Sequence, residues 1–126
     1  MTNILLLPKW RASLLITTNG DYREAFEFVS GPDDAASPID ISGIAFRLQM
    51  RRDAGSPVVA ISGSTTDGRL VNNGPTGVLE MRFPVADLIH MVPGSYVADL
   101  IAGADGVTVN LCPDPITVEV RQGVTR

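Results

Sequence analysis

The chain has 126 residues, a hydrophobic content of 44% and a formal net charge of −4 at pH 7. This length is typical of one domain, and it is long enough to bury a substantial core without disulfides or metal ions. The ten basic residues form no basic run, so this acidic chain is a poor candidate for binding nucleic acid through its phosphates.

Cysteine content and hydropathy set further limits. Cys112 is the only cysteine, which excludes an intramolecular disulfide, and we expect it to be a buried, unreactive thiol in the apolar segment 107–112. The apolar run 4–7 is much shorter than a signal-peptide core, and its positive charges follow the run instead of preceding it. No segment approaches the ~20 apolar residues of a membrane helix. We therefore expect no membrane partner and a location in the cytoplasm, or in an assembly built there.

Two short segments are the first candidates for strands. Residues 14–17 are apolar and partly β-branched, and they end at the strong turn signal of residues 19–20. Residues 22–29 alternate apolar and polar side chains, so we expect the two segments to pair as a hairpin across that turn. The polar stretch 30–38 is expected to be a loop, because a strand would not tolerate its composition.

The segment 43–52 has the clearest pattern in the chain. Four apolar side chains at positions 44, 46, 48 and 50 alternate with Ala45, Arg47, Gln49 and Arg51. A period of two places the apolar side chains on one face of a strand and the polar ones on the other. This predicts a half-buried antiparallel strand with one face on a core and the other facing water or a partner.

Short strands separated by turns continue to the end of the chain. One helical segment of one or two turns is expected near residues 85–92, between two prolines, and a hairpin is expected at Asp105-Gly106. The other strands are expected at 58–61, 69–72, 79–83, 96–101, 107–111 and 116–121. About eight strands at this spacing, with no linker or repeat, predict one all-β domain over residues 1–126, either a sandwich or a barrel. Residues 1–12 are a candidate extended N-terminal arm.

The residue inventory does not provide a catalytic, metal or cofactor site. His90 is the only histidine, and no serine or cysteine motif accompanies it, so neither a nucleophilic triad nor a zinc site can be assembled. The aspartates in predicted turns lack the spacing of a calcium-binding loop, and turns favour aspartate for backbone reasons. Glu80, Asp99 and Glu119 are expected on solvated strand faces instead of in a glycosidase cleft. We expect no enzyme.

Trp10 is the side chain in the N-terminal region with most potential for binding. It lies beside Arg11 and follows the apolar run 4–7. One interpretation is that Trp10 covers one end of the core, with its indole N–H bonded to a carbonyl. The other is that it anchors a protein interface or stacks on a sugar ring.

Several segments together resemble short proteins encoded in the tail regions of bacteriophages and prophages. They are Trp10-Arg11 with Asn19-Gly-Asp21, residues 38–51 (PIDISGIAFRLQMR), residues 67–70 (DGRL), residues 93–100 (PGSYVADL) and the terminal residues 118–126. Such proteins are similar to the immunoglobulin-like N-terminal domain of phage upper-baseplate proteins, which attaches host-recognition parts to the tail. The resemblance covers nearly the whole chain from about residue 10.

The resemblance implies an antiparallel immunoglobulin-like β-sandwich in the virion, packed against other virion proteins in a multi-copy assembly. In the baseplate family further chain follows the domain, whereas this sequence ends at Arg126, so we expect an adaptor, decoration or cement subunit. The alternatives are a capsid decoration protein and a carbohydrate-binding module that stacks sugar on Trp10, Tyr22 or Tyr96. The interface candidates are Trp10, Arg11, Arg47, Gln49 and Arg51, because arginine suits interface ion pairs.

Overall fold

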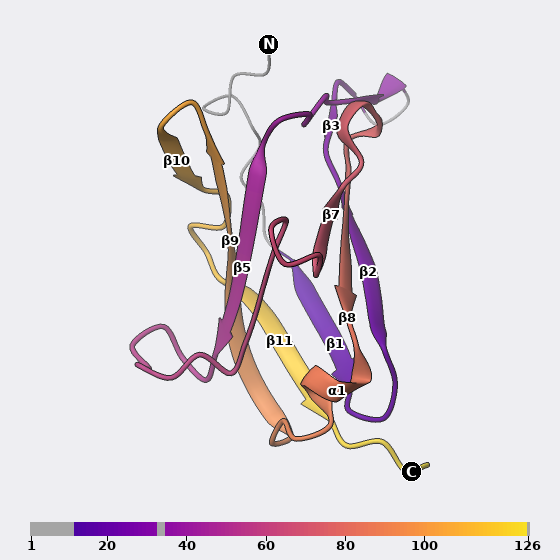
Figure 1. Cartoon of the computed structure of the whole chain (residues 1–126), viewed down its shortest axis with the longest axis vertical. Helices are drawn as coiled ribbons and strands as arrows, with labels where there is room; N and C mark the ends of the chain where they lie inside the picture. Colours follow the sequence, from indigo (N-terminus) through magenta and orange to yellow (C-terminus); the bar gives the residue numbers. More distant parts are fainter. Residues whose placement is uncertain (1–11, 33–34, 126) are drawn as a thin grey trace.

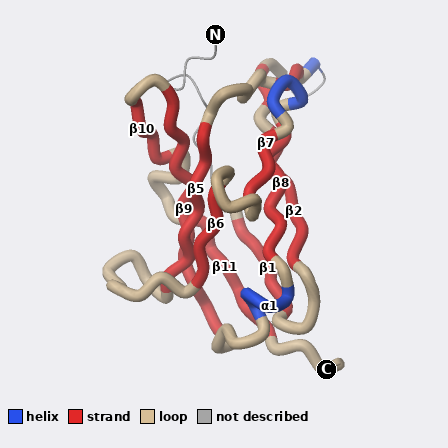
Figure 2. Tube along the Cα trace, viewed as in Figure 1, coloured by secondary structure: helices blue, strands red, loops and turns tan. Residues whose placement is uncertain are grey.

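The computed structural model describes residues 12–32 and 35–125. The interface candidates Trp10 and Arg11, and the candidate arm apart from Ala12, lie outside the described residues. Strands dominate this part of the chain and form two larger layers, with one short helix at the end where the C-terminus lies (Figures 1 and 2). The expectation of an all-β fold is confirmed.

Three sheets contain the strands. The largest has the order β1(Ser13–Thr17), β11(Ile116–Arg121), β9(Gly94–Ala104), β5(Ala45–Arg51) and β6(Ile61–Ser64), and β10(Val107–Asn110) also pairs with β9. The second has the order β2(Tyr22–Glu27), β8(Val78–Phe83) and β7(Leu70–Asn72). The third pairs β3(Val29–Ser30) with β4(Ser37–Pro38). The helical elements include α1(Val85–Leu88) and the 3-10 turn η3(Gly74–Thr76).

One hydrophobic core joins the two larger sheets. Alternate residues of β1, β5, β8, β9 and β11 are buried, as the period of two requires. On β5 these are Phe46, Leu48 and Met50, each at most 1% exposed, and on β8 they are Leu79, Met81 and Phe83. Because both sets belong to one contiguous cluster, the sheets pack face to face, and their other faces are left to solvent or partners.

The hairpin expected across residues 19–20 is wrong. β1 pairs in parallel with β11, and β2 pairs with β8, so the turn connects two sheets instead of two strands of one sheet. The C-terminal segment holds this turn: the Thr18 N–H donates to the Arg121 carbonyl at 3.1 Å, and the Asn19 side chain donates to the Thr125 carbonyl at 3.0 Å.

Two further expectations require correction. The strand expected at 58–61 lies at Ile61–Ser64, and Val58 and Val59 are exposed in the preceding loop. Gly63 suits its place in the observed strand, because a Cβ at this position would lie 2.9 Å from Cζ of Phe83 and the ring would have to shift. The expectation that the stretch 30–38 is only a loop is also wrong, because Ser30, Ser37 and Pro38 take part in the short pairing of β3 with β4.

Other local expectations are confirmed. Asp105 and Gly106 both have positive φ, 51° and 77°, which suits the tight hairpin turn between β9 and β10. The helical segment exists but is one turn long, Val85–Leu88, and His90 follows it in an exposed position. Within the described ranges, no helix has the length and apolar character needed to cross a membrane.

Candidate docking face

The outer face of β5 and β9 gathers the three described interface candidates. Arg47, Gln49 and Arg51 alternate with the buried residues of β5 and point away from the core, as the sequence predicts. The pairing register places Arg47 beside Ile101, Gln49 beside Asp99 and Arg51 beside Val97. We call the surface formed by Arg47, Gln49, Arg51, Val97, Asp99 and Ile101 the docking face.

The three candidates differ in how they are engaged. Arg51 is half-buried and donates to the Ser56 carbonyl at 2.8 Å and to Oε1 of Gln49 at 3.2 Å, so it holds the loop that follows β5. Arg47 is exposed and has no hydrogen bond or ion pair with any residue in the described ranges. Arg47 is therefore the member of the set whose charge is available to a partner.

Two hollows flank the outward residues of β5. The smaller, about 190 Å³, is lined by residues that include Gln49, Arg51, Val97 and Asp99. The larger, about 410 Å³, lies between β5, β9, β10 and the loop after β6, and Arg47 and Ile101 contribute to its wall. Each hollow thus combines one arginine with a branched aliphatic side chain, Val97 in the smaller and Ile101 in the larger.

This arrangement suits contact with a protein surface. Val97 and Ile101 are half-buried, and they provide apolar area between polar neighbours. The Asp99 carboxylate accepts a hydrogen bond from the Asn110 side chain at 3.1 Å, so its charge is partly satisfied within the chain. Apolar area surrounded by a polar rim, with an arginine beside it, is the composition of many protein interfaces.

A contact between Arg52 and Tyr96, which we call the clamp, lies next to the docking face and was not apparent in the sequence. The Arg52 guanidinium lies 4.3 Å from the centroid of the Tyr96 ring, a cation–π contact, and donates to the carbonyls of Pro93 and Ser95. Gly94 leaves room for it, since a Cβ there would lie 2.4 Å from Nη1 of Arg52 and the glycine has a φ of 140°. The alternation in the sequence gives no sign of these contacts, because they join Arg52 to residues more than 40 positions away.

The clamp also bears on sugar binding. Tyr96 is 4% exposed, Arg52 lies over its ring, and its hydroxyl donates to the Val92 carbonyl at 2.6 Å. Tyr96 is therefore not available as a stacking platform, and that part of the carbohydrate-binding alternative is wrong. Tyr22 is half-buried, and burial together with the nearby Glu24 raises its pKa to about 12.

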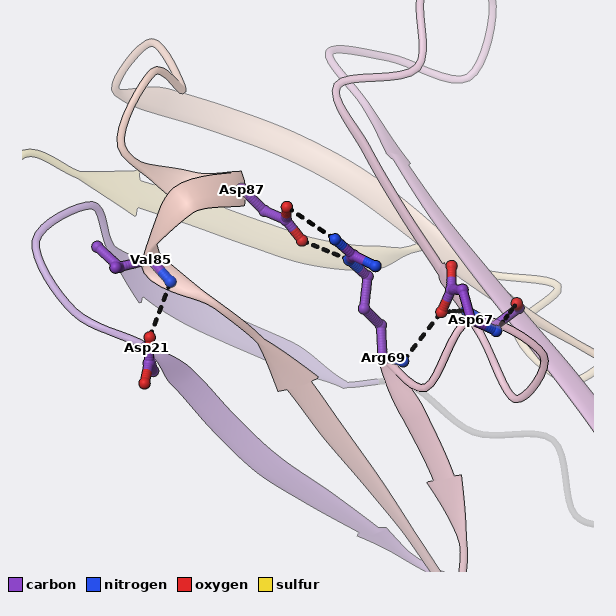
Figure 3. A network of polar contacts seen from close by, with 6 residues as sticks. Asp21, Asp67, Arg69, Val85 and Asp87 are labelled. Atoms are coloured by element: carbon purple, nitrogen blue, oxygen red, sulfur yellow. Dashed lines mark hydrogen bonds and ion pairs between the residues drawn. The ribbon is translucent and has the colours of Figure 1, made fainter.

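A polar network fixes α1 against the smaller of the two larger sheets (Figure 3). Nη2 of Arg69 donates to Oδ1 of Asp87 at 3.0 Å, and Nε donates to Oδ2, so the pair is bidentate. This contact with Arg69 lowers the pKa of the Asp87 carboxyl. Asp67 accepts from the Arg69 N–H, and Asp21 accepts from the Val85 N–H at 2.8 Å. These carboxylates hold backbone and helix in place.

Two further carboxylates are held in ion pairs, and the cysteine thiol is buried. Glu80 pairs with Arg82, and Glu119 pairs with Arg121, both on outward faces as expected. Cys112 is 1% exposed, two residues after the end of β10, and burial raises the pKa of its thiol. In the part of the chain that the structure describes, no three histidine, cysteine, aspartate or glutamate residues are grouped so that they could hold a metal ion.

No protein-family model matches the chain, and no curated protein sequence matches it.

Proposed function

We propose that the chain is a non-catalytic structural protein of a bacteriophage virion, and that its docking face binds another virion subunit, as a tail or baseplate adaptor. The observation that carries the proposal is Arg47, a partnerless arginine in the described structure, beside a hollow of about 410 Å³ whose wall includes Ile101. The sequence resemblance to phage tail-region proteins gives the setting in which such a face would act.

We also propose that the two larger sheets form an immunoglobulin-like sandwich. The order β2-β8-β7 facing β11-β9-β5 supports this, because it corresponds to strands B, E, D and G, F, C of that fold. Tyr96 adds support, since it lies near the start of β9 and its hydroxyl bonds the Val92 carbonyl four residues upstream. This is the geometry of the tyrosine corner of immunoglobulin-like domains.

The chemistry of the docking face favours an acidic partner segment. A carboxylate of the partner could form a bidentate contact with the Arg47 guanidinium, because five N–H donors in a planar fork match two carboxylate oxygens. An aliphatic side chain from the same segment would fill the hollow beside Ile101. Exclusion of water by the partner would strengthen the electrostatic attraction between the two charges, and the bidentate hydrogen bonds would offset the cost of desolvating them.

Incorporation into particles tests the proposal. Virions assembled from the genome that encodes the chain are purified and probed for the wild-type protein, for Arg47→Glu and for Arg23→Glu. Arg23 is a matched control because it is also exposed and lies on the outer face of the other large sheet. We expect wild-type protein and Arg23→Glu in the particles and strong loss of Arg47→Glu. Wild-type protein absent from the particles, or equal incorporation of both variants, would refute the proposal.

A further inference from the structure

β1 presents an open edge with a defined hydrogen-bonding pattern. The Thr117 N–H donates to the Ala12 carbonyl at 3.2 Å, and the Thr18 N–H donates to the Arg121 carbonyl at 3.1 Å. Because backbone groups alternate in direction along a strand, the even-numbered residues of β1 bond β11, and Ser13, Leu15 and Thr17 direct theirs to the opposite side. No strand in the described ranges pairs with that side.

The other edge strands are protected in ways that β1 is not. β2 carries Arg23, Glu24 and Glu27, and Glu24 occupies an inward position of the strand although it is exposed. An inward-pointing charge on an edge strand opposes pairing with another chain. β6 contains a glycine, β7 has three residues and β10 has four. β1 has five residues, none charged, and no glycine or proline.

We propose that β1 pairs in antiparallel fashion with β1 of a second copy of this chain, about a two-fold axis at Leu15. In that register Leu15 lies opposite its own copy, and Ser13 lies opposite Thr17. Leu15 is 49% exposed on the outer face, so the pairing buries apolar surface there. Serine opposite threonine allows hydroxyl hydrogen bonds across the strands. The pairing joins two six-stranded sheets into one, and it does not depend on the proposed function.

Charge does not oppose this approach, although each chain has a net charge of −4. Among the described residues, the charged side chains that the register places beside β1 are on β11, where Glu119 lies beside Leu15 and is paired with Arg121 at 3.2 Å. Across the joined sheet the two Glu119 side chains would be three strand spacings apart, about 14 Å. That exceeds the Debye length of about 8 Å at physiological salt, so their repulsion is largely screened.

A cysteine at the two-fold axis tests the register. In a hydrogen-bonded antiparallel pair the two Cα atoms are about 5.5 Å apart, which a disulfide can span. Leu15→Cys is incubated with oxidised glutathione beside the wild type and Ala25→Cys. Ala25 is exposed at the centre of the β2 edge, and the buried Cys112 provides the background. We expect Leu15→Cys to form a linked dimer much faster than Ala25→Cys. Equal rates, or no dimer, would overturn the proposal.

Analytical ultracentrifugation tests the same pairing without cross-linking. A single strand pair is a small interface, so we expect a reversible dimer whose population rises with protein concentration. Leu15→Lys places two like charges directly opposite and should weaken the dimer at least about tenfold. The monomer should remain folded, because the lysine faces solvent beside Glu119. A wild-type protein that stays monomeric at its solubility limit, or a Leu15→Lys dimer as tight as wild type, would contradict the proposal.

Discussion

Leu48→Ala is the substitution expected to destabilise the central strand most clearly. Leu48 is 0% exposed, and it lies between Leu100 of β9 and Gly63 of β6 in the pairing register. The substitution removes three carbon groups, which is about 2.4 kcal/mol of transfer free energy at about 0.8 kcal/mol each. A cavity term adds to this because a two-sheet core cannot collapse fully around the site. We expect a total loss of about 3–5 kcal/mol in the free energy of unfolding.

Urea denaturation followed by circular dichroism measures this loss, and thermal melting should show a drop in Tm of roughly 10 °C or more. Arg47→Ala is the matched control, since the neighbouring residue on the same strand is exposed and partnerless in the described structure. We expect Arg47→Ala to change the unfolding free energy by less than about 0.5 kcal/mol. A Leu48→Ala loss below about 1 kcal/mol, or an equal loss in both variants, would show that the faces of β5 are assigned wrongly.

Three further predictions concern the clamp and the polar network. Asp87→Asn should lower the Tm at neutral pH, because a carboxyl whose pKa is lowered by folding stabilises the fold only while it is ionised. The difference in Tm from wild type should vanish as the pH falls below about 4, and a difference independent of pH would contradict this. Gly94→Ala should lower the free energy of unfolding, measured by urea titration, by about 1–3 kcal/mol because of the φ of 140° at this position. Gly20→Ala, with nothing within 4 Å of the added Cβ, should leave it nearly unchanged, and equal effects of the two substitutions would show that strain at Gly94 is not the cause. Tyr96→Phe should lower the free energy of unfolding by about 0.5–1.5 kcal/mol, because the hydrogen bond to the Val92 carbonyl is lost while the contact with Arg52 remains. An unchanged urea midpoint would show that this hydrogen bond adds nothing to stability.

Local alternation is sufficient to predict the strands whose two faces differ strongly. β11 is observed at the predicted residues 116–121, and β5 lies within the predicted segment 43–52. In both, a period of two settles which residues are buried, and burial settles which face is outward. The same reasoning fails at β6, where Val58 and Val59 are apolar but exposed and Gly63 is buried against Phe83. That outcome depends on a ring from another sheet, which a local pattern cannot contain.

The partners of several strands are far away in the chain, so a local pattern in the sequence does not reveal which strands pair. The Asn19-Gly20 turn has the composition of a hairpin, yet β1 pairs with β11, about 100 residues away in the chain, and the Asn19 side chain bonds Thr125. The candidate site shows the same limit. Alternation places Arg47 and Arg51 on one face, but only the fold shows that Arg51 is bonded to Ser56 and that Arg47 is not engaged within the described residues. The contact between Arg52 and Tyr96 likewise requires the register of β5 on β9.

We propose that the surface around Arg47 is covered by another subunit in the assembled particle. The most direct measurement is the rate at which a thiol reagent labels Arg47→Cys, in the isolated protein and in purified particles, with Arg23→Cys as the control on the other large sheet. We expect rapid labelling at both positions in the isolated protein and strong protection of position 47 alone in the particle. Equal labelling of the two positions in the particle would contradict it.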